Sequence, residues 1–182
     1  MTLKITIPDV ELFDDKTQEF ITVYGQQLEL EHSLISLSKW ESKFCKPFLT
    51  DDKKTAFESA YYVKCMTMTQ NVKNDEMYYY ISEKVMKEIQ DYIALPMTAV
   101  KFGKQGNKTF NKETTTNEII YYWMITLQIP VEFQKWHLNR LLTLINVCNI
   151  KNQPVKKRSA NDILTEQARQ NEIRKAQLHT EG

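Results

Sequence analysis

The fold is decided by two neighbouring segments, Glu118-Ile-Ile-Tyr-Tyr-Trp-Met-Ile-Thr-Leu-Gln-Ile-Pro130 and Trp136-His-Leu-Asn-Arg-Leu-Leu-Thr-Leu-Ile-Asn-Val-Cys-Asn-Ile150. Apolar residues recur in both at intervals of three and four, which predicts two α-helices. Pro130 ends the first helix and suits the first turn of the next, and the short link favours an antiparallel pair. So much of the pair is apolar that it must either form the centre of a compact domain or present a surface to a partner.

Polar residues mark the ends and sides of this helical pair. Thr115-Thr-Asn-Glu118 is typical of a capping box, in which the threonine hydroxyl satisfies a free backbone N–H and the glutamate reaches back. Lys135, Asn139 and Arg140 fall near the polar side of the second helix. The apolar stripe of that helix is predicted to comprise Trp136, Leu141, Leu144, Ile145 and Cys148.

Length and composition limit the class of protein. A chain of 182 residues fits one domain with an appendage and can bury a core. The formal net charge of +1 predicts attraction to neither nucleic acid nor membranes. Only four glycines and five prolines are present, which favours long regular elements over a loop-rich sandwich or barrel.

Targeting signals and cysteines point to the cytoplasm. No run approaches the roughly 18 apolar residues of a membrane span. Residues 1–8 lack a secretory hydrophobic region and cleavage site, so the protein is expected to stay in the cytosol of the producing cell. Cys45, Cys65 and Cys148 are odd in number and far apart, and we expect buried free thiols rather than a disulfide framework.

The N-terminal region reads as strands. Leu3, Ile5 and Ile7 alternate with polar residues up to Pro8. Residues 20–24 and 28–30 flank Gly25, which suggests a hairpin or a bulge. A small antiparallel sheet of two or three strands is expected, and such a sheet must pack on helices to be stable.

The middle region reads as helices, separated by residues typical of helix caps and by breaks in the apolar pattern. Three helices are predicted, over residues 33–47, from a cap at Thr50 or Asp51 to Met68, and from a cap at Asn74 over residues 76–94. Residues 98–102 suggest a short returning strand. Residues 103–108 form a glycine-containing basic loop that is expected to be exposed.

A basic linker and a polar helix are predicted after residue 150. Residues 151–182 contain seven Lys or Arg and four Asp or Glu, a net charge of +3, which leaves −2 for the remainder. Residues 162–178 contain good helix formers but few apolar positions, so this helix would be marginal alone. The prediction is an α+β, mainly helical fold: one domain over residues 1–150, β-rich in 1–31 and mainly helical in 32–150, followed by an extended C-terminal helix.

Motifs for catalysis, metals and cofactors are missing from the sequence. Glu29-Leu-Glu-His32 offers one Glu-x-x-His, whereas a di-metal bundle needs two. His32, His137 and His179 are far apart in sequence and are not expected to cluster, which disfavours zinc. No nucleophile elbow, phosphate loop or dinucleotide fingerprint is present. We therefore expect a non-enzymatic protein without a cofactor.

Basic and aromatic residues remain as binding signals. Lys101, Lys104 and Lys108 could touch a phosphate backbone, as could residues 156–158, although such segments are usually only solvated. The aromatic residues mostly suit a core, yet neighbouring tyrosines point to different helix faces, so some must lie near the surface. Exposed Tyr and Trp are favoured in interfaces. The partner-binding residues predicted are Trp40, Tyr121, Tyr122, Trp123, Trp136 and Arg140.

Several segments resemble the tail assembly chaperones of long-tailed bacteriophages. They are residues 28–44 (Leu-Glu-Leu-Glu-His-Ser-Leu-Ile-Ser-Leu-Ser-Lys-Trp-Glu-Ser-Lys-Phe), 62–72, 118–125 and 135–152, and the resemblance extends over about residues 28–180. It implies a protein that keeps the tape measure protein soluble while tube subunits polymerise around it, with no catalytic residue. An apolar, aromatic groove could cover helical stripes of such a partner.

Other functions stay open. A structural virion component, such as a head–tail connector or tail protein, would self-assemble or enter particles. A nucleic-acid-binding protein would bind with steep salt dependence. The predicted partner is the tape measure protein in the host cytoplasm; self-association is open, nucleic acid is disfavoured and no membrane is expected.

Overall fold

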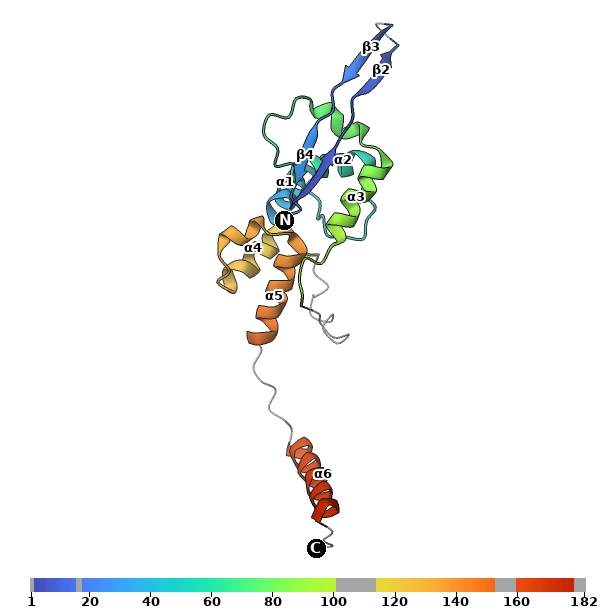
Figure 1. Cartoon of the computed structure of the whole chain (residues 1–182). Coiled ribbons are helices and arrows are strands. Elements are labelled where there is room, and N and C mark those ends of the chain that lie inside the picture. Colours follow the sequence, from blue (N-terminus) through green and yellow to red (C-terminus); the bar gives the residue numbers. More distant parts are fainter. Residues whose placement is uncertain (1, 16–17, 101–113, 153–159, 179–182) are drawn as a thin grey trace. The chain divides into compact units, whose positions relative to one another are not determined.

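The computed structural model describes residues 2–15, 18–100, 114–152 and 160–178. The chain divides into two compact units, Met1–Asn149 and Ile150–Gly182. The strands and most of the helices belong to the first unit, and helix α6 (Ala160–Leu178) belongs to the second (Figure 1). The prediction of a mainly helical α+β fold with antiparallel strands at the N-terminus is confirmed.

The N-terminal strands form two antiparallel pairs. β1 (Leu3–Thr6) pairs with β4 (Gln27–Leu30), and β2 (Val10–Asp14) pairs with β3 (Glu19–Val23). Gly25 lies where one pair gives way to the other, and a Cβ there would lie 2.0 Å from the carbonyl oxygen of Ile7. Four strands are present rather than two or three, because β2, with its acidic residues, gives only a weak strand signal.

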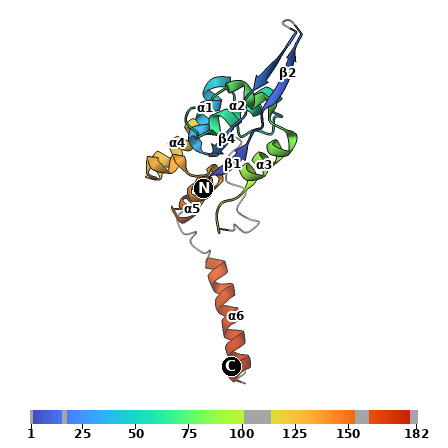
Figure 2. The ribbon, with the colours of Figure 1, turned by 45° about the horizontal axis from the view of Figure 1, so that its top comes forward.

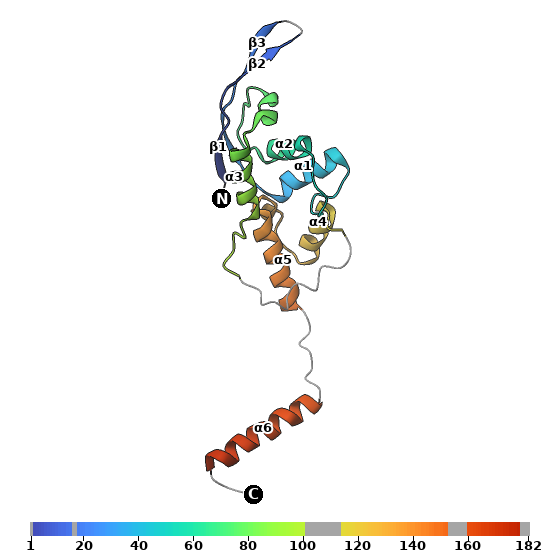
Figure 3. The ribbon, with the colours of Figure 1, turned by 90° about the vertical axis from the view of Figure 1, so that its right-hand side faces the viewer.

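The two strand pairs differ in their packing. In the β1–β4 pair, Ile5, Leu28 and Leu30 are buried against the helices. The β2–β3 pair extends beyond the helices in all three views (Figures 1, 2 and 3). It reaches the core through Val23, which is buried at its base, and through Leu12, in the middle of β2, which packs against the cluster on one side. The expectation that the strands pack on helices therefore holds for the inner pair and is wrong for most of the outer one.

Helices α1 (Leu34–Phe44) and α2 (Ala56–Met66) each begin with a capping box. The Ser33 cap of α1 agrees with the predicted start. In α2 the cap is Thr55, whose hydroxyl accepts the N–H of Glu58 while the Glu58 carboxylate accepts the N–H of Thr55. The predicted cap at Thr50 or Asp51 is wrong, because only Thr55 has a glutamate three residues later to complete the box.

The predicted helix over 76–94 is two elements. Asn74 does cap, but it caps the 3-10 helix η1 (Asp75–Tyr80), and α3 (Glu83–Ala94) starts anew at Ser82. Residues 98–100 are not a strand, and the rest of that predicted strand and the loop 103–108 lie outside the described residues.

The predicted helical pair is present as α4 (Asn117–Thr126) and α5 (Leu138–Asn152), joined by the 3-10 helix η3 (Val131–Lys135). The predicted capping box at 115–118 is wrong. The cap is Thr116, which makes no side-chain bond to the helix backbone and instead donates its hydroxyl to Glu118.

Two hydrophobic clusters fill the first unit. One joins the inner strands with α1, α2, η1 and α3, and it contains Trp40, Met66 and Ile89 among its buried residues. The other is formed by α1, α4 and α5. Its buried residues are Leu34, Leu37, Ile120, Met124, Leu138, Leu141 and Ile145. Helix α1 contributes to both clusters, so the helical pair is attached to the rest of the unit mainly through it.

Two further expectations concern the burial of the cysteines and the lack of a membrane-spanning helix. All three cysteines are free and Cys65 is buried, but the expectation of buried thiols is wrong for the half-buried Cys148 and for the exposed Cys45. Cys45 terminates α1 in the left-handed conformation, with its N–H bonded to the carbonyl of Glu41. None of the helices among the described residues combines the length and hydrophobicity that crossing a membrane requires.

Candidate interaction surface

The position of α4 is set by a carboxylate from α1. Glu41 is buried, and its Oε2 accepts the backbone N–H and the side-chain amide of Asn117, each at 2.7 Å. Its Oε1 accepts the N–H of Phe48, also at 2.7 Å. A carboxylate at a helix N-terminus replaces the missing side-chain cap and faces the positive end of the helix dipole. Glu41 therefore fixes both the start of α4 and the loop after α1.

A Schellman motif ends α4. The N–H of Ile129 bonds to the carbonyl of Met124, and that of Gln128 bonds to the carbonyl of Ile125. Gln128 takes the left-handed conformation, with φ of 54°, where glycine is the usual residue. The last residue of the helix, Thr126, thus lies four positions before Pro130, and Pro130 is the N-cap of η3 instead.

The start of α5 is held by two other elements. The N–H of Leu138 donates to the carbonyl of His32, just before α1. The side-chain amide of Asn139 donates to the carbonyls of Ile93 and Leu95 at the C-terminal end of α3. Asn139 was predicted on the polar side of its helix, and it uses that side to cap another helix. These bonds make the helical pair a fixed platform.

The outward side of this platform carries exposed apolar side chains. Tyr122 and Ile125 lie three residues apart on α4 and are 64% and 76% exposed. Val131, at the start of η3, is also exposed. We call these three residues the α4 outer face. Exposed large apolar groups are unremarkable singly, but Tyr122 and Ile125 lie close together on one helix face, which makes this face a candidate contact site.

Phe133, Trp136 and Arg140 stack in a row from η3 into α5, and we call this row the aromatic ladder. The rings of Phe133 and Trp136 stack with centroids 4.0 Å apart, and the guanidinium of Arg140 lies 4.0 Å from the Trp136 ring. Cation–π stacking of this kind holds an arginine in one conformation while its donors stay exposed. Trp136 and Arg140 are thus brought together, as two residues in a surface that a partner could contact.

Tyr121 and Trp123 are only half-buried, on the sides of α4. The Tyr121 hydroxyl donates to Oε1 of Gln134 at 2.8 Å, and burial raises the pKa of the Tyr121 hydroxyl. Both rings pack against the cluster formed by α1, α4 and α5. They connect the core to the surface rather than forming the outer face.

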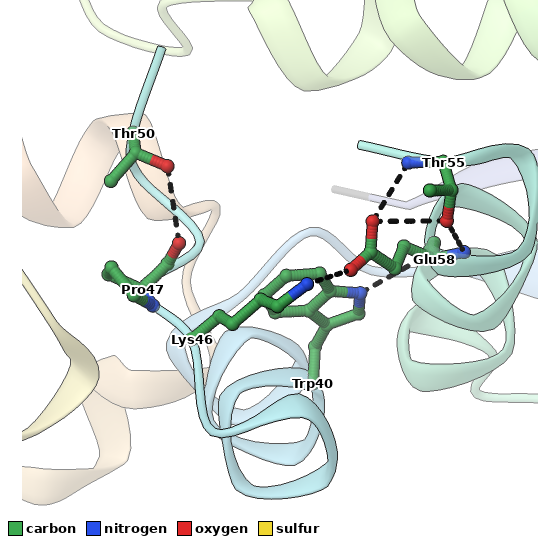
Figure 4. A network of polar contacts seen from close by, with 6 residues as sticks. All are labelled: Trp40, Lys46, Pro47, Thr50, Thr55 and Glu58. Atoms are coloured by element: carbon green, nitrogen blue, oxygen red, sulfur yellow. Dashed lines mark hydrogen bonds and ion pairs between the residues drawn. The ribbon is translucent and has the colours of Figure 1, made fainter. Parts of the chain in front are cut away.

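Trp40 is in the core, contrary to its predicted place in a partner-binding surface. It is 2% exposed, and its indole N–H donates to the carbonyl of Glu58 at 2.9 Å (Figure 4). In the same network, Lys46 contacts the Glu58 carboxylate at 3.0 Å. The backbone N–H of Thr55, followed by the Lys46 ammonium, lowers the pKa of Glu58 from 4.5 to about 2. Trp40 cannot reach a partner unless α1 and α2 separate.

Two histidines do meet, which corrects the expectation that the histidines never cluster. The rings of His32 and His137 lie 4.9 Å apart, edge to face. Nδ1 of His32 is 2.7 Å from the Tyr62 hydroxyl, and Nε2 of His137 is 3.2 Å from the carbonyl of Tyr92. Burial lowers the pKa of His32 to about 3 and also lowers the pKa of His137. Both rings are therefore neutral at pH 7.

The structure thus separates the six predicted residues. Tyr122 is on the α4 outer face, Trp136 and Arg140 form the ladder, Tyr121 and Trp123 lie between surface and core, and Trp40 is buried. Ile125 and Val131 were missed, because the prediction favoured aromatic residues. Phe133 was missed too, since it falls in the link between the helices. The spacing of three between Tyr122 and Ile125 was the available signal.

Among the described residues, no group of three or more His, Cys, Asp or Glu side chains is placed to hold a metal ion. The cleft between the end of α1 and the start of α4 has a volume of about 320 Å³ and is lined by residues that include Glu41, Cys45 and Asn117. The Glu41 carboxylate there is already bonded to backbone and amide donors. No protein-family model, curated protein or solved structure matches the chain.

Proposed function

We propose that this protein is a non-enzymatic chaperone of phage tail assembly, which binds apolar helical segments of the tape measure protein in the host cytoplasm. The observation that carries the proposal is the α4 outer face, Tyr122, Ile125 and Val131, on a platform fixed by Glu41, His32 and Asn139. The resemblance of residues 118–125 and 135–152 to tail assembly chaperones falls on this same platform.

The chemistry of the surface suits a temporary helical partner. Helix-in-groove recognition uses apolar anchors spaced three and four residues apart, and the α4 outer face offers matching anchors. Only a few large side chains are exposed, so each copy would bind modestly and tube subunits could displace it. Arg140, which the Trp136 ring orients, adds an exposed positive charge to the same helical pair.

Co-expression with the tape measure protein of the same phage tests this proposal. A soluble complex is expected on affinity pull-down, with this protein absent from purified virions on a parallel blot. Failure to keep the tape measure protein soluble would overturn the proposal.

A structural virion component is the second candidate, favoured by the strand pair that projects beyond the helices (Figure 1). Its expected signature is a fixed number of copies in purified virions. The third candidate, nucleic-acid binding, rests on residues 101–108 and 156–158, which lie outside the described residues.

A further inference from the structure

The β2–β3 hairpin presents exposed aromatic side chains. Phe13 and Phe20 face each other across the strands, with ring centroids 5.2 Å apart, and Phe20 is 73% exposed. Tyr24, one residue after the end of β3, is also exposed. A two-stranded hairpin is marginally stable alone, so exposed aromatic groups of this kind point to a contact that covers them.

The same hairpin is acidic. Residues 9–24 contain five carboxylates and one lysine, a net charge of −4 in a chain whose total is +1. The carboxylates are those of Asp9, Glu11, Asp14, Asp15 and Glu19. A surface that fits this hairpin should therefore combine aromatic rings with positive charge.

A groove between α1 and α2 has both properties. It has a volume of about 500 Å³ and is lined by Ser38, Lys39, Ser42, Tyr61, Lys64 and Cys65. At Tyr61 it meets an aromatic cluster on the surface. The Tyr61 ring lies 5.3 Å from that of Phe44, and Phe57 stacks on Tyr79 with centroids 5.7 Å apart and planes 8° from parallel.

The exposed charges of these two helices are all positive. On α1 and α2, which the structure describes throughout, they are those of Lys39, Lys43 and Lys64. The two glutamates of these helices, Glu41 and Glu58, are buried. Lys64 pairs with Asp75 of η1. The remaining positive groups of the two helices are Lys39, which lines the groove, and Lys43, one helical turn further along α1.

We propose that the β2–β3 hairpin of one copy docks in the α1–α2 groove of a second copy. Its carboxylates would lie near Lys39 and Lys43, and Phe13 and Phe20 would pack on the cluster around Tyr61. The hairpin extends away from the helices of its own chain (Figures 1 and 3). The contact joins two different surfaces, so every docked pair keeps one free hairpin and one free groove, and further copies can add as a ring or a chain. This inference does not depend on the proposed function.

Mixing two defective variants tests the contact most sharply. Phe13→Ser/Phe20→Ser removes the aromatic pair from the hairpin, and Lys39→Glu/Lys43→Glu reverses the charge beside the groove. In sedimentation velocity, the wild type is expected to associate with rising concentration and each variant to stay monomeric. Their mixture should form a one-to-one complex, because it still contains one intact hairpin and one intact groove.

Charge exchange provides the second arm, for the case in which the serine variant alters the hairpin fold. Glu11→Lys/Glu19→Lys should abolish self-association and should bind Lys39→Glu/Lys43→Glu in a mixture. Lys84→Glu/Lys87→Glu, exposed on α3, is the matched control and should associate like the wild type. Thermal unfolding of each variant checks the fold.

Three results would overturn the inference. The first is a wild type that is monomeric at every concentration in low salt. The second is a folded hairpin or groove variant that still associates with itself. The third is a pair of complementary variants that form no complex when they are mixed. A tape measure complex that forms with monomeric protein would leave the proposed function intact while refuting this contact.

Discussion

At the scale of the residue, Glu41 has the widest influence on the candidate surface. Its carboxylate is buried, belongs to α1, and accepts hydrogen bonds from Asn117 at the start of α4 and from Phe48 in the loop after α1. A local reading of the sequence assigned the helix start to Thr115 and Glu118, since a capping box is visible in four consecutive residues. The actual cap comes from a residue 76 positions away, which no local pattern can reveal.

Glu41→Gln should destabilise the protein by about 2 kcal/mol, because the amide nitrogen cannot accept one of these bonds and leaves buried donors unpaired. Urea unfolding measures the loss, and hydrogen exchange should increase first at the N–H groups of Asn117 and Phe48. Glu88→Gln, on the exposed side of α3, should change the stability by less than about 0.5 kcal/mol. Equal effects of the two substitutions would contradict this role of Glu41.

Gln128 occupies a left-handed position that glycine adopts without strain. Gln128→Gly should therefore raise the free energy of unfolding by about 0.5–1 kcal/mol. The matched control is Gln90→Gly within α3, which should lower it by about 1 kcal/mol. If Gln128→Gly also destabilises the protein, the Schellman end of α4 is not formed as described.

The buried histidine pair predicts acid sensitivity. The folded pKa of His32 is lowered to about 3 by burial and then by His137, from an ordinary value of 6.5. The unfolded chain therefore takes up a proton below pH 6.5 that the folded chain does not, and stability falls as the pH drops towards 3. The slope from this group approaches about 1.4 kcal/mol for each pH unit.

His32→Asn should remove that part of the slope, because an asparagine amide can approach the Tyr62 hydroxyl and does not titrate. Urea midpoints measured from pH 7.5 to pH 4 compare the two proteins. His137, which also has a lowered pKa, remains in both and leaves a residual slope. An identical pH dependence in wild type and variant would refute a neutral, buried His32.

At the scale of the element, spacing predicted the helices well and their ends poorly. The apolar period placed α1, α4 and α5 close to their observed positions. It joined η1 and α3 into one helix, because a 3-10 turn followed by a new cap preserves nearly the same spacing. The exposure of a side chain also depends on tertiary contacts. Trp40 and Tyr122 are both aromatic residues in predicted helices, but only the helix of Trp40, α1, is covered on two sides by the two clusters.

Helix α4 should therefore respond differently on its two faces. Ile120→Ala leaves a cavity in the cluster between α1 and α5 and should cost about 2–4 kcal/mol. Ile125→Ala, on the α4 outer face, should change the free energy of unfolding by less than about 0.5 kcal/mol. Both are read from denaturant unfolding. A large loss with Ile125→Ala would mean that this side chain is part of the core and not of a binding surface.

At the scale of the whole molecule, acidic and basic residues are concentrated in different segments of the chain, which the small net charge does not reveal. Residues 151–182 carry +3 and the hairpin over residues 9–24 carries −4, within a total of +1. The net charge alone predicts no electrostatic partner. The acidic and basic segments are visible in the sequence, but the sequence does not show which surfaces carry them. The structure shows that the acidic hairpin extends beyond the helices and that the glutamates of α1 and α2 are buried.

The most direct measurement of the central claim is the soluble fraction of the tape measure protein on co-expression with wild type and with Tyr122→Ser/Ile125→Ser. Met68→Ser, at an exposed position outside both proposed contact surfaces, is the control. The variant is expected to unfold at the wild-type temperature yet lose most of the solubilisation, while the control retains it. A folded Tyr122→Ser/Ile125→Ser protein that keeps the tape measure protein as soluble as the wild type does would contradict the assignment of the α4 outer face.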